Sequence, residues 1–264
     1  MKRIATSLVL IPMIVWVVLA APVWVFDAVL AAVGLLAFHE FDQIAKAQGI
    51  TPAGLPGMAA GLALLFIKEP FTPEAFLVAA MAALAAMIFA LRVRDLGSAL
   101  PSAAVFLLGV IYIFGAWRCA MGLREINPHW LMIALLVSWA GDTAALYIGR
   151  AFGKHKLAPR VSPSKTWEGS AGSVAGGTLA AGIYAHYLIP PAPLGAVLAL
   201  AAAANIAGQM GDLCESAFKR GAGMKDSGTM LPGHGGWLDR IDSSLFSVPV
   251  VYATLVFILN HVHV

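Results

Sequence analysis

The sequence predicts an all-α, polytopic integral membrane protein, because it is strongly apolar, sparsely charged and divided into long hydrophobic runs. Hydrophobic residues make up 60% of the 264 residues and charged residues 12%, with a mean hydropathy of +0.82. Soluble domains carry about 25% charged residues, so this composition excludes a water-soluble globule. Runs of roughly 17 to 20 apolar residues recur, and each could cross a hydrocarbon core of about 30 Å as a helix.

We expect about nine transmembrane helices in a single domain over residues 1–264. The first run follows Met1-Lys2-Arg3, a start that is also typical of a cleaved secretory signal. The apolar pattern continues directly into a second span, which favours a retained helix. The third span is short, and Pro56 leaves its beginning open. The expected spans are Ile4–Ala20, Pro22–Phe38, Leu55–Ile67, Ala75–Leu91, Leu100–Trp117, Trp130–Ile148, Ser170–Leu188, Leu194–Met210 and Leu245–His261.

The distribution of basic residues predicts which loops face the cytoplasm, where Lys and Arg are enriched. With the amino terminus inside, 14 of the 17 basic residues fall in inner segments, and only Lys68, Arg118 and Arg124 fall outside. We therefore expect a protein of the inner (plasma) membrane with its polar loops in the cytoplasm. Because these residues lie in separate short loops, membrane lipid is favoured over nucleic acid as a polyanionic partner. The inner residues are Lys2, Arg3, Lys46, Arg92, Arg94, Arg150, Lys154, Lys156, Arg160, Lys165, Lys219, Arg220, Lys225 and Arg240.

The most polar inner segment runs from Gly211 to Asp242 and begins as a continuation of the eighth span. Without proline in its first ten residues, it predicts a helix with carboxylates and a cation on one face. The residues on that face, at positions i, i+3, i+4 and i+7, are Asp212, Glu215, Ser216 and Lys219. Near the end of the segment, Asp239 and Asp242 share one face of a helix that leads into the ninth span.

A glycine-containing loop separates these two acidic helical ends. Its turns could aim backbone N–H groups at an anion, and His234 lies inside it. Clustered carboxylates suit a hard cation such as Mg²⁺, and the neighbouring basic side chains could neutralise phosphate oxygens. This combination indicates phosphoryl or nucleotidyl transfer. The alternative is a solvated loop whose charges only fix the topology, but charge between bilayer-depth helices is usually functional.

The second polar segment, residues 150–169, contains Ser162-Pro163, which predicts an N-cap and first helical residue for the seventh span. The helix start, with Lys165 and the hydroxyls of Ser164 and Thr166, could then hold a phosphate, although capping alone explains the pattern equally well. Upstream, Asp142 lies about two turns from the inner end of the sixth span. A carboxylate at that depth is a functional candidate, and helix-to-helix hydrogen bonding is the alternative.

These segments resemble the motifs of the phosphatidate cytidylyltransferases, also called CDP-diacylglycerol synthases. The similarity lies in Ser216–Arg220, Lys225-Asp226 and Leu231–Asp242, and it extends to Ser162–Gly169 and Gly141–Thr143. It covers about the last half of the chain, residues 129–264, whereas the spans of residues 1–128 carry no motif that can be placed.

The resemblance implies transfer of the cytidylyl group of CTP to phosphatidate with Mg²⁺, and a second cation such as K⁺ beside it. It implies Asp212 and Asp239 as the principal metal ligands, to which we add Asp242. The candidate catalytic residues are Lys219, Arg220, Lys225, Asp226, His234 and Arg240. The candidate substrate-binding residues are Asp142, Ser162, Ser164, Lys165, Thr166, Gly235 and Gly236.

Other classes of protein share single features of this pattern. An ion-coupled transporter also uses intramembrane carboxylates, but near the bilayer midplane rather than at one face. An enzyme that consumes CDP-activated lipid would need a different acidic motif, and a structural scaffold would not need clustered carboxylates. Small residues at Gly169, Ser173 and Gly177 allow close helix packing, either within the monomer or in a homodimer.

Overall fold

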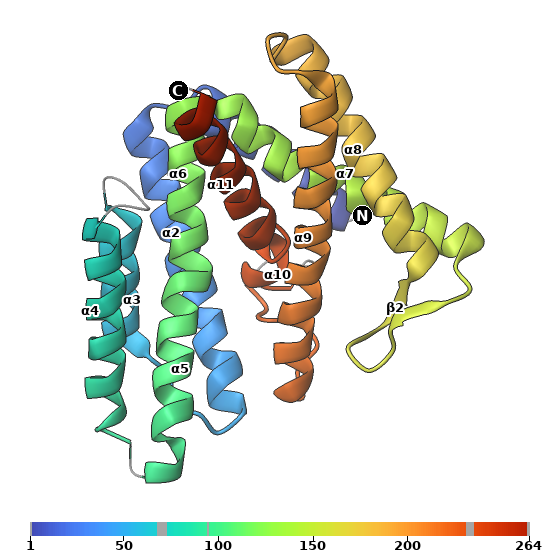
Figure 1. Ribbon diagram of the computed structural model, residues 1–264. Helices are drawn as coiled ribbons and strands as arrows, with labels where there is room; N and C mark the ends of the chain where they lie inside the picture. The colour runs from blue at the N-terminus through green and yellow to red at the C-terminus, as the bar shows by residue number, and fades with distance from the viewer. Residues whose placement is uncertain (1, 68–72, 94, 231–234, 263–264) are drawn as a thin grey trace. The chain divides into compact units, whose positions relative to one another are not determined.

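A computed structural model describes residues 2–67, 73–93, 95–230 and 235–262 of the chain (Figure 1). The chain divides into two compact units, each made of two stretches of sequence. The first unit combines Met1–Gly122 with Phe218–Ile241, and the second combines Leu123–Ala217 with Asp242–Val264. The long helix α9 (Leu194–Gly221) belongs to the second unit up to Ala217 and to the first unit from Phe218 onward.

The first unit contains the helices of the amino-terminal half. They are α1 (Lys2–Leu19), α2 (Val23–Ala47), α3 (Gly54–Leu65), α4 (Pro73–Ala90), the short η1 (Leu96–Ser98), α5 (Ala99–Gly109), the π-helical turn η2 (Val110–Gly115) and α6 (Ala116–Ile126). The last stretch of this unit adds α10 (Leu238–Ile241). A loop, part of which lies outside the described residues, connects α9 to α10.

Aromatic side chains and glycines hold the first unit together. Phe38 on α2 and Phe114 on η2 are fully buried, with their ring centroids 5.7 Å apart. A Cβ at Gly61 of α3 would overlap the Phe114 ring, and one at Gly109 of α5 would lie 2.8 Å from Phe38. The two phenyl rings therefore occupy the space that larger side chains on α3 and α5 would fill. This close approach of helices is typical of membrane proteins.

The second unit contains α7 (Pro128–Phe152), the hairpin β1 (Lys156–Ala158) and β2 (Ser162–Thr166), α8 (Trp167–Leu188), the larger part of α9, and α11 (Ser244–Val262). Helices α7 and α8 pack against each other, and glycines permit the close approach. Buried Asn205 on α9 donates hydrogen bonds to the Val137 carbonyl oxygen (2.8 Å) and to Ser173 Oγ (3.2 Å). The small residues Ser173 and Gly177 thus pack within the chain.

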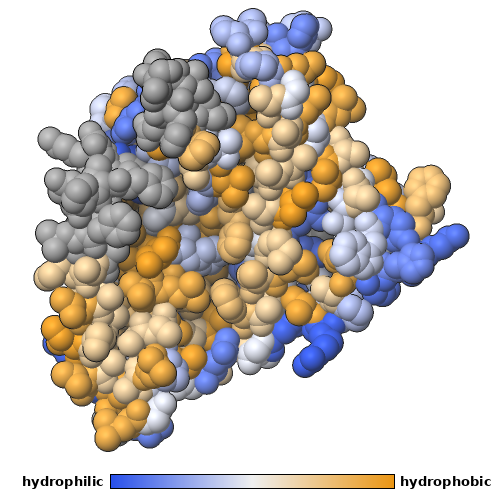
Figure 2. Space-filling model, viewed as in Figure 1, coloured by the Kyte–Doolittle hydropathy of each residue, from blue (hydrophilic) through white to orange (hydrophobic). Residues whose placement is uncertain are grey.

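The helical class of the fold is confirmed. Each predicted span overlaps a helical segment, although Leu55–Ile67 runs past the end of α3 and Leu100–Trp117 crosses α5, η2 and α6. Four helical segments of the described chain are long and apolar enough to cross a membrane: Val23–Ala47, Leu96–Ile126, Pro128–Phe152 and Leu194–Gly221. Hydrophobic residues also cover much of the face shown in Figure 2. These features indicate membrane association, while the total of about nine spans stays a prediction.

Two local predictions are wrong. Ser162 does not cap a helix, because residues 162–166 form β2, which pairs antiparallel with β1. The helix starts later, and Thr166 is its cap: its hydroxyl oxygen accepts a hydrogen bond of 3.1 Å from the Gly169 N–H. Pro163 fits the two-stranded hairpin because an edge strand leaves some N–H groups unpaired. Second, α10 ends at Ile241, so Asp242 lies in the turn at residues 242–243 and not on the helix that carries Asp239.

We expect Gly177→Ala to lower the thermal midpoint of the detergent-solubilised protein. A Cβ there would lie 2.6 Å from the Val137 carbonyl oxygen and 2.8 Å from Asn205 Nδ2, so the close packing of α8 must loosen. Such overpacking costs about 1–3 kcal/mol. Gly195→Ala is the control, because its Cβ would have no neighbour within 4 Å and alanine favours the helix. Equal midpoints for the two variants would contradict this packing.

Candidate functional site

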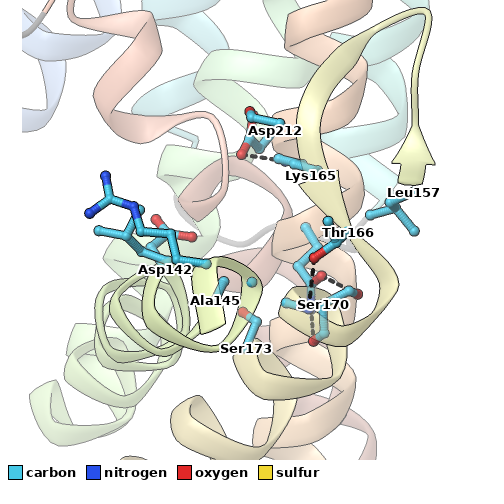
Figure 3. A pocket seen from close by; sticks show the side chains of 14 residues that line it. Asp142, Ala145, Leu157, Lys165, Thr166, Ser170, Ser173 and Asp212 are labelled. Atoms are coloured by element: carbon cyan, nitrogen blue, oxygen red, sulfur yellow. Dashed lines mark hydrogen bonds and ion pairs between the residues drawn. The ribbon is translucent and has the colours of Figure 1, made fainter. Parts of the chain in front are cut away.

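A cavity of about 360 Å³ in the second unit lies among α7, the hairpin, α8 and α9. Its lining includes Asp142, Arg150, Ser164, Lys165 and Asp212, so it brings both charged and hydroxyl groups to one place. Figure 3 shows Asp142 and Asp212 on different helices around this space, with Lys165 reaching toward Asp212. The sequence predicted four of these five lining residues as site residues, and Arg150 is the exception.

Lys165 and Asp212 form an ion pair across the cavity. The ammonium nitrogen lies 2.5 Å from Asp212 Oδ2, and the two side chains are 27% and 29% exposed. Asp212 Oδ1 also accepts a hydrogen bond of 3.3 Å from Ser216 Oγ, one turn further along α9. Because the pair is partly open to solvent, it adds little stability and could exchange partners with an incoming charged ligand.

A polar chain lies behind the ion pair. Ser170 Oγ donates to Gln209 Oε1 at 2.5 Å, and Gln209 Nε2 donates to Asn205 Oδ1 at 2.7 Å. Each side chain is fixed by the next, which orients the cavity wall between α8 and α9.

Four acidic side chains of the second unit act on one another electrostatically. Burial raises the pKa of the Asp242 carboxyl well above its ordinary value, and the negative charges of Asp212, Glu215 and Asp142 raise it further. Glu215 is completely buried on α9. Repulsion of this kind favours binding of a cation, which would allow the carboxylates to stay ionised together.

These residues suit the open coordination of a magnesium ion better than a metal site made only of protein ligands. Within the described chain, no three acidic, histidine or cysteine side chains are arranged as a metal-ligand set. Mg²⁺ does not need such a set, because it keeps several waters and binds through one or two carboxylates together with substrate phosphates. The acidic cluster of Asp142, Asp212, Glu215 and Asp242 offers that kind of oxygen donor.

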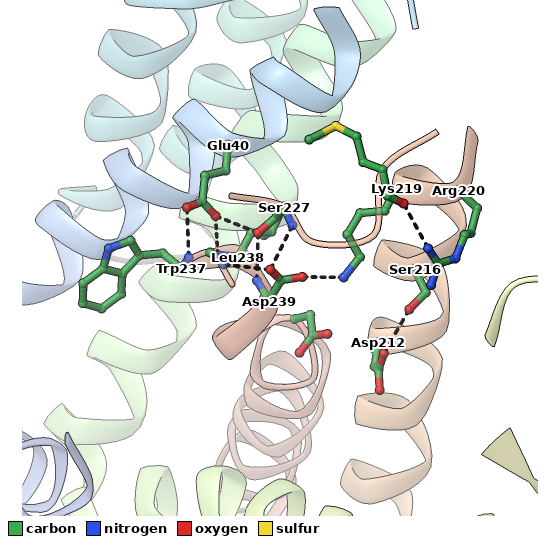
Figure 4. Close-up of polar contacts among 12 residues, drawn as sticks. Glu40, Asp212, Ser216, Lys219, Arg220, Ser227, Trp237, Leu238 and Asp239 are labelled. Atoms are coloured by element: carbon green, nitrogen blue, oxygen red, sulfur yellow. Dashed lines mark hydrogen bonds and ion pairs between the residues drawn. The ribbon is translucent and has the colours of Figure 1, made fainter. Parts of the chain in front are cut away.

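The first unit, described by itself, contains a charged centre around Asp239 (Figure 4). Asp239 Oδ1 forms an ion pair with Lys219 of α9, and both side chains are buried. Its other oxygen, Oδ2, accepts hydrogen bonds from the backbone N–H groups of Ser227 (2.9 Å) and Gly236 (2.8 Å). Burial alone would raise the pKa of Asp239, but Lys219 and these N–H donors lower it below the ordinary value, so the carboxylate stays charged.

Two backbone N–H groups of the described part of the glycine loop therefore contact a carboxylate of the protein itself. Contact of the loop with a substrate anion stays a prediction. Gly235 has a φ of +78°, a conformation that glycine adopts easily. Gly236 is buried, and its N–H points to Asp239 rather than to an open site. His234 lies outside the described residues.

The remaining candidates differ in how exposed they are. Lys225, Asp226, Arg220 and Arg240 are exposed, with Arg220 Nη1 donating to the Met224 carbonyl oxygen at 3.1 Å. In the hairpin, Ser164 is exposed and Ser162 is half-buried. Thr166 is buried, and its hydroxyl caps α8.

A clip at the base of the hairpin was not predicted. Glu168 Oε2 accepts the backbone N–H of Lys154 at 3.1 Å, and Oε1 lies 2.6 Å from His155 Nδ1. The hydrogen bond with His155, followed by those from backbone N–H groups, lowers the pKa of Glu168 to about 2. The hairpin that carries Ser164 and Lys165 is thus tied to the first turn of α8.

Sequence reasoning also missed Glu40 on α2, whose buried carboxylate contacts the loop of the first unit at Ser227, Trp237 and Leu238. The signal was present, because Glu40 is a carboxylate at the end of a long apolar span. A charge at such a position is a functional candidate by default.

Comparison with known proteins identifies what the whole chain is similar to. The sequence model of the cytidylyltransferase family matches residues 1–258. A phosphatidate cytidylyltransferase of Brucella suis is 36% identical over 262 residues, covering 95% of this chain and 91% of its own length. Proteins of the same name from Staphylococcus saprophyticus (34% over 227 residues, 84% and 87% covered) and Bacillus subtilis (32% over 242 residues, 87% and 88% covered) are also similar.

Thr166→Ala should lower the thermal midpoint, because the α8 N-terminus loses the hydroxyl that accepts the Gly169 N–H. Loss of such a cap costs about 1 kcal/mol. Ser162→Ala is the matched control and should leave the midpoint nearly unchanged. A larger decrease in the thermal midpoint at Ser162 than at Thr166 would instead support a helix that starts at Ser162 and would contradict the hairpin.

Asp242→Asn should raise the thermal midpoint at neutral pH when divalent cations are chelated. The folded state raises the pKa of Asp242, so its contribution to stability is complete only below the pKa of the unfolded chain and is lost as pH rises. The neutral amide avoids this loss, and the difference between variant and parent should shrink in acid. Asp226→Asn, at an exposed position, is the control. A midpoint for Asp242→Asn below that of the parent at neutral pH would show that the acidic cluster is not repulsive.

Proposed function

We propose that this chain, which belongs to the cytidylyltransferase family, transfers the CMP group of CTP to phosphatidate and releases CDP-diacylglycerol and pyrophosphate. The observation that carries the proposal is similarity along nearly the whole chain to proteins named phosphatidate cytidylyltransferase. The same name recurs among relatives from staphylococci, Bacillus and Brucella, and each alignment covers at least 84% of this chain. The substrates therefore come from the relatives, and the roles of residues come from the site.

The reaction joins two polyanions, which explains why the chain pairs cations with carboxylates. A phosphate oxygen of phosphatidate attacks the α-phosphorus of CTP, forming a new P–O bond as the bond to the β-phosphate oxygen breaks. Pyrophosphate leaves with that electron pair. Because the attacking oxygen is already an anion, no general base is required. Catalysis then depends on positioning and on neutralising phosphate charge.

Lysine and arginine side chains of both polar centres suit this role. Lys165 lies at the cavity beside the start of α8, where backbone N–H groups and the positive end of the helix dipole also attract phosphate. Lys219 is held next to Asp239, and Lys225 and Arg240 are exposed. We propose that these groups contact the phosphates of the two substrates, with Arg220, Asp226 and His234 as further candidates.

A divalent cation completes the proposal. On the basis of their sequence motifs we propose Asp212, Asp239 and Asp242 as Mg²⁺ ligands. The ion, when bound, would neutralise phosphate oxygens and polarise the α-phosphate. The acidic cluster in the second unit fits such an ion on electrostatic grounds. Asp239 now contacts Lys219 and two backbone N–H groups, so its use as a ligand requires a change of partners. A second cation such as K⁺ is part of the same proposal.

The membrane setting follows from the substrates. Phosphatidate would keep its acyl chains in the bilayer and enter between helices, whereas CTP would arrive from the cytoplasm. The predicted topology, with its basic inner loops, supports a cytoplasmic position for the polar segments. We therefore propose that the protein lies in the inner (plasma) membrane with its active site facing the cytoplasm.

Purified protein in detergent should release pyrophosphate when it receives phosphatidate, CTP and Mg²⁺ together, and chelation of the metal should stop the reaction. Asp239→Asn should abolish the signal, because Lys219 and the loop N–H groups would lose their charged partner. Asp95→Asn, which changes an exposed carboxylate at the start of η1, should retain activity. No pyrophosphate from well-folded parent protein would refute the proposed reaction.

A further inference from the structure

Glu40 is a buried carboxylate in the half of the chain that carries no recognised motif. It lies on α2, is 3% exposed and contacts the loop of the first unit that leads to Asp239. Its Oε2 accepts hydrogen bonds from Ser227 Oγ (2.8 Å) and the Leu238 N–H (2.9 Å), and its Oε1 accepts the Trp237 N–H (3.0 Å). Among the described residues, these three hydrogen-bond donors to Glu40 are neutral groups.

The loop is shaped to receive this carboxylate. A Cβ on Gly228 would lie 2.5 Å from Glu40 Oε1, and a Cβ on Gly236 would overlap Oε2. Both glycines therefore leave the space that the carboxylate fills. Burial of a charged carboxylate costs free energy, so we expect Glu40 to have a functional role.

Ser227 connects Glu40 to Asp239. Its hydroxyl donates to Glu40 and accepts the Asp239 N–H at 3.3 Å, while its own N–H donates to Asp239 Oδ2 at 2.9 Å. The carboxylates of Glu40 and Asp239 thus both accept hydrogen bonds from Ser227, as Figure 4 shows. Movement of Glu40 would release Ser227 and with it two of the groups that hold Asp239.

Helix α2 and the residue that follows it also contact α9 at Phe218, the residue before Lys219. Gln48 Nε2 donates to the Phe218 carbonyl oxygen at 3.1 Å, and the Phe41 and Phe218 rings meet edge to face with centroids 6.2 Å apart. Contacts from α2 therefore hold the segment on either side of the Lys219–Asp239 ion pair.

We infer that Glu40 is a positioning residue for cytidylyl transfer, acting through Ser227 and the backbone of residues 237–238 to fix Asp239 opposite Lys219. This role rests on the proposed function, because it assigns the ion pair to the reaction. Glu40 itself contacts neither substrate. It provides the rigid support that a reacting site needs to hold its charged groups in place.

Glu40→Gln tests this role in the full-length protein. The amide keeps the volume of the side chain but turns one acceptor into a donor that faces the loop donors. We expect kcat for pyrophosphate release to fall by about tenfold or more, with a smaller change in the KM for CTP, because the misplaced groups act on the reacting phosphates. Hydrogen exchange of peptides covering residues 226–240 should become faster.

Asp42→Asn is the matched control. Asp42 is a second buried carboxylate on α2 that accepts two backbone N–H groups, those of Ala53 (2.9 Å) and Gly54 (2.7 Å), but it supports α3 rather than the loop. Its variant should keep kcat per folded molecule within about twofold and leave exchange of residues 226–240 unchanged. Equal loss of kcat in both variants would reduce Glu40 to a general packing role.

Ser227→Ala provides a second, smaller change on the same pathway. It should lower kcat as Glu40→Gln does. The kcat of the double variant should be no lower than that of the less active single variant, because both substitutions act through one loop. If Glu40→Gln does not fold, Ser227→Ala decides: unchanged kcat and unchanged exchange would overturn the inference. A parent protein without cytidylyl transfer would refute the proposed function instead, and the exchange data would still show whether Glu40 holds the loop.

Discussion

Carboxylates in the two polar centres must find their compensation inside the protein, because the helices around them are apolar. A buried charge without donors would cost several kcal/mol, so the local structure is organised around supplying donors. At Asp239 this supply is complete: an ammonium group and two backbone N–H groups surround the side chain, and the loop takes its shape from those contacts. Glu40 shows a similar arrangement, with neutral hydrogen-bond donors from the described part of the loop.

The second unit meets the same constraint in a different way. Asp212 of its acidic cluster pairs with Lys165, and Asp242 has negative neighbours that oppose its ionisation. The carboxylate of Asp239 is thus stabilised by donors of its own loop and by Lys219, whereas ionisation of Asp242 is opposed by burial and by neighbouring negative charge.

Much of the fold was predictable from the sequence, because apolar runs of bilayer length leave the backbone little choice but to form helices. The segments that carry charge were also identified correctly as the distinctive ones, and the family was recognised from them. Local geometry was harder. Ser162-Pro163 matches a helix start, yet pairing with Lys156–Ala158 makes it a strand, and sequence spacing gives no sign of that pairing. The fate of the glycine N–H groups was equally hidden, because Asp239 folds back on the loop. Glu40 was missed because its partners lie almost 200 positions away.

The two glycines that enclose the Glu40 carboxylate have a consequence for the evolution of this chain. Position 40 lies in the half without a motif, yet its side chain fills the space left by Gly228 and Gly236. A shorter residue at position 40 would open a void there, and a Cβ at either glycine would force the Glu40 carboxylate to move. Substitutions at these three positions are therefore coupled, so related sequences should more often keep or replace them together. The amino-terminal half of the chain is in this way coupled to the sequence of the loop that leads to Asp239.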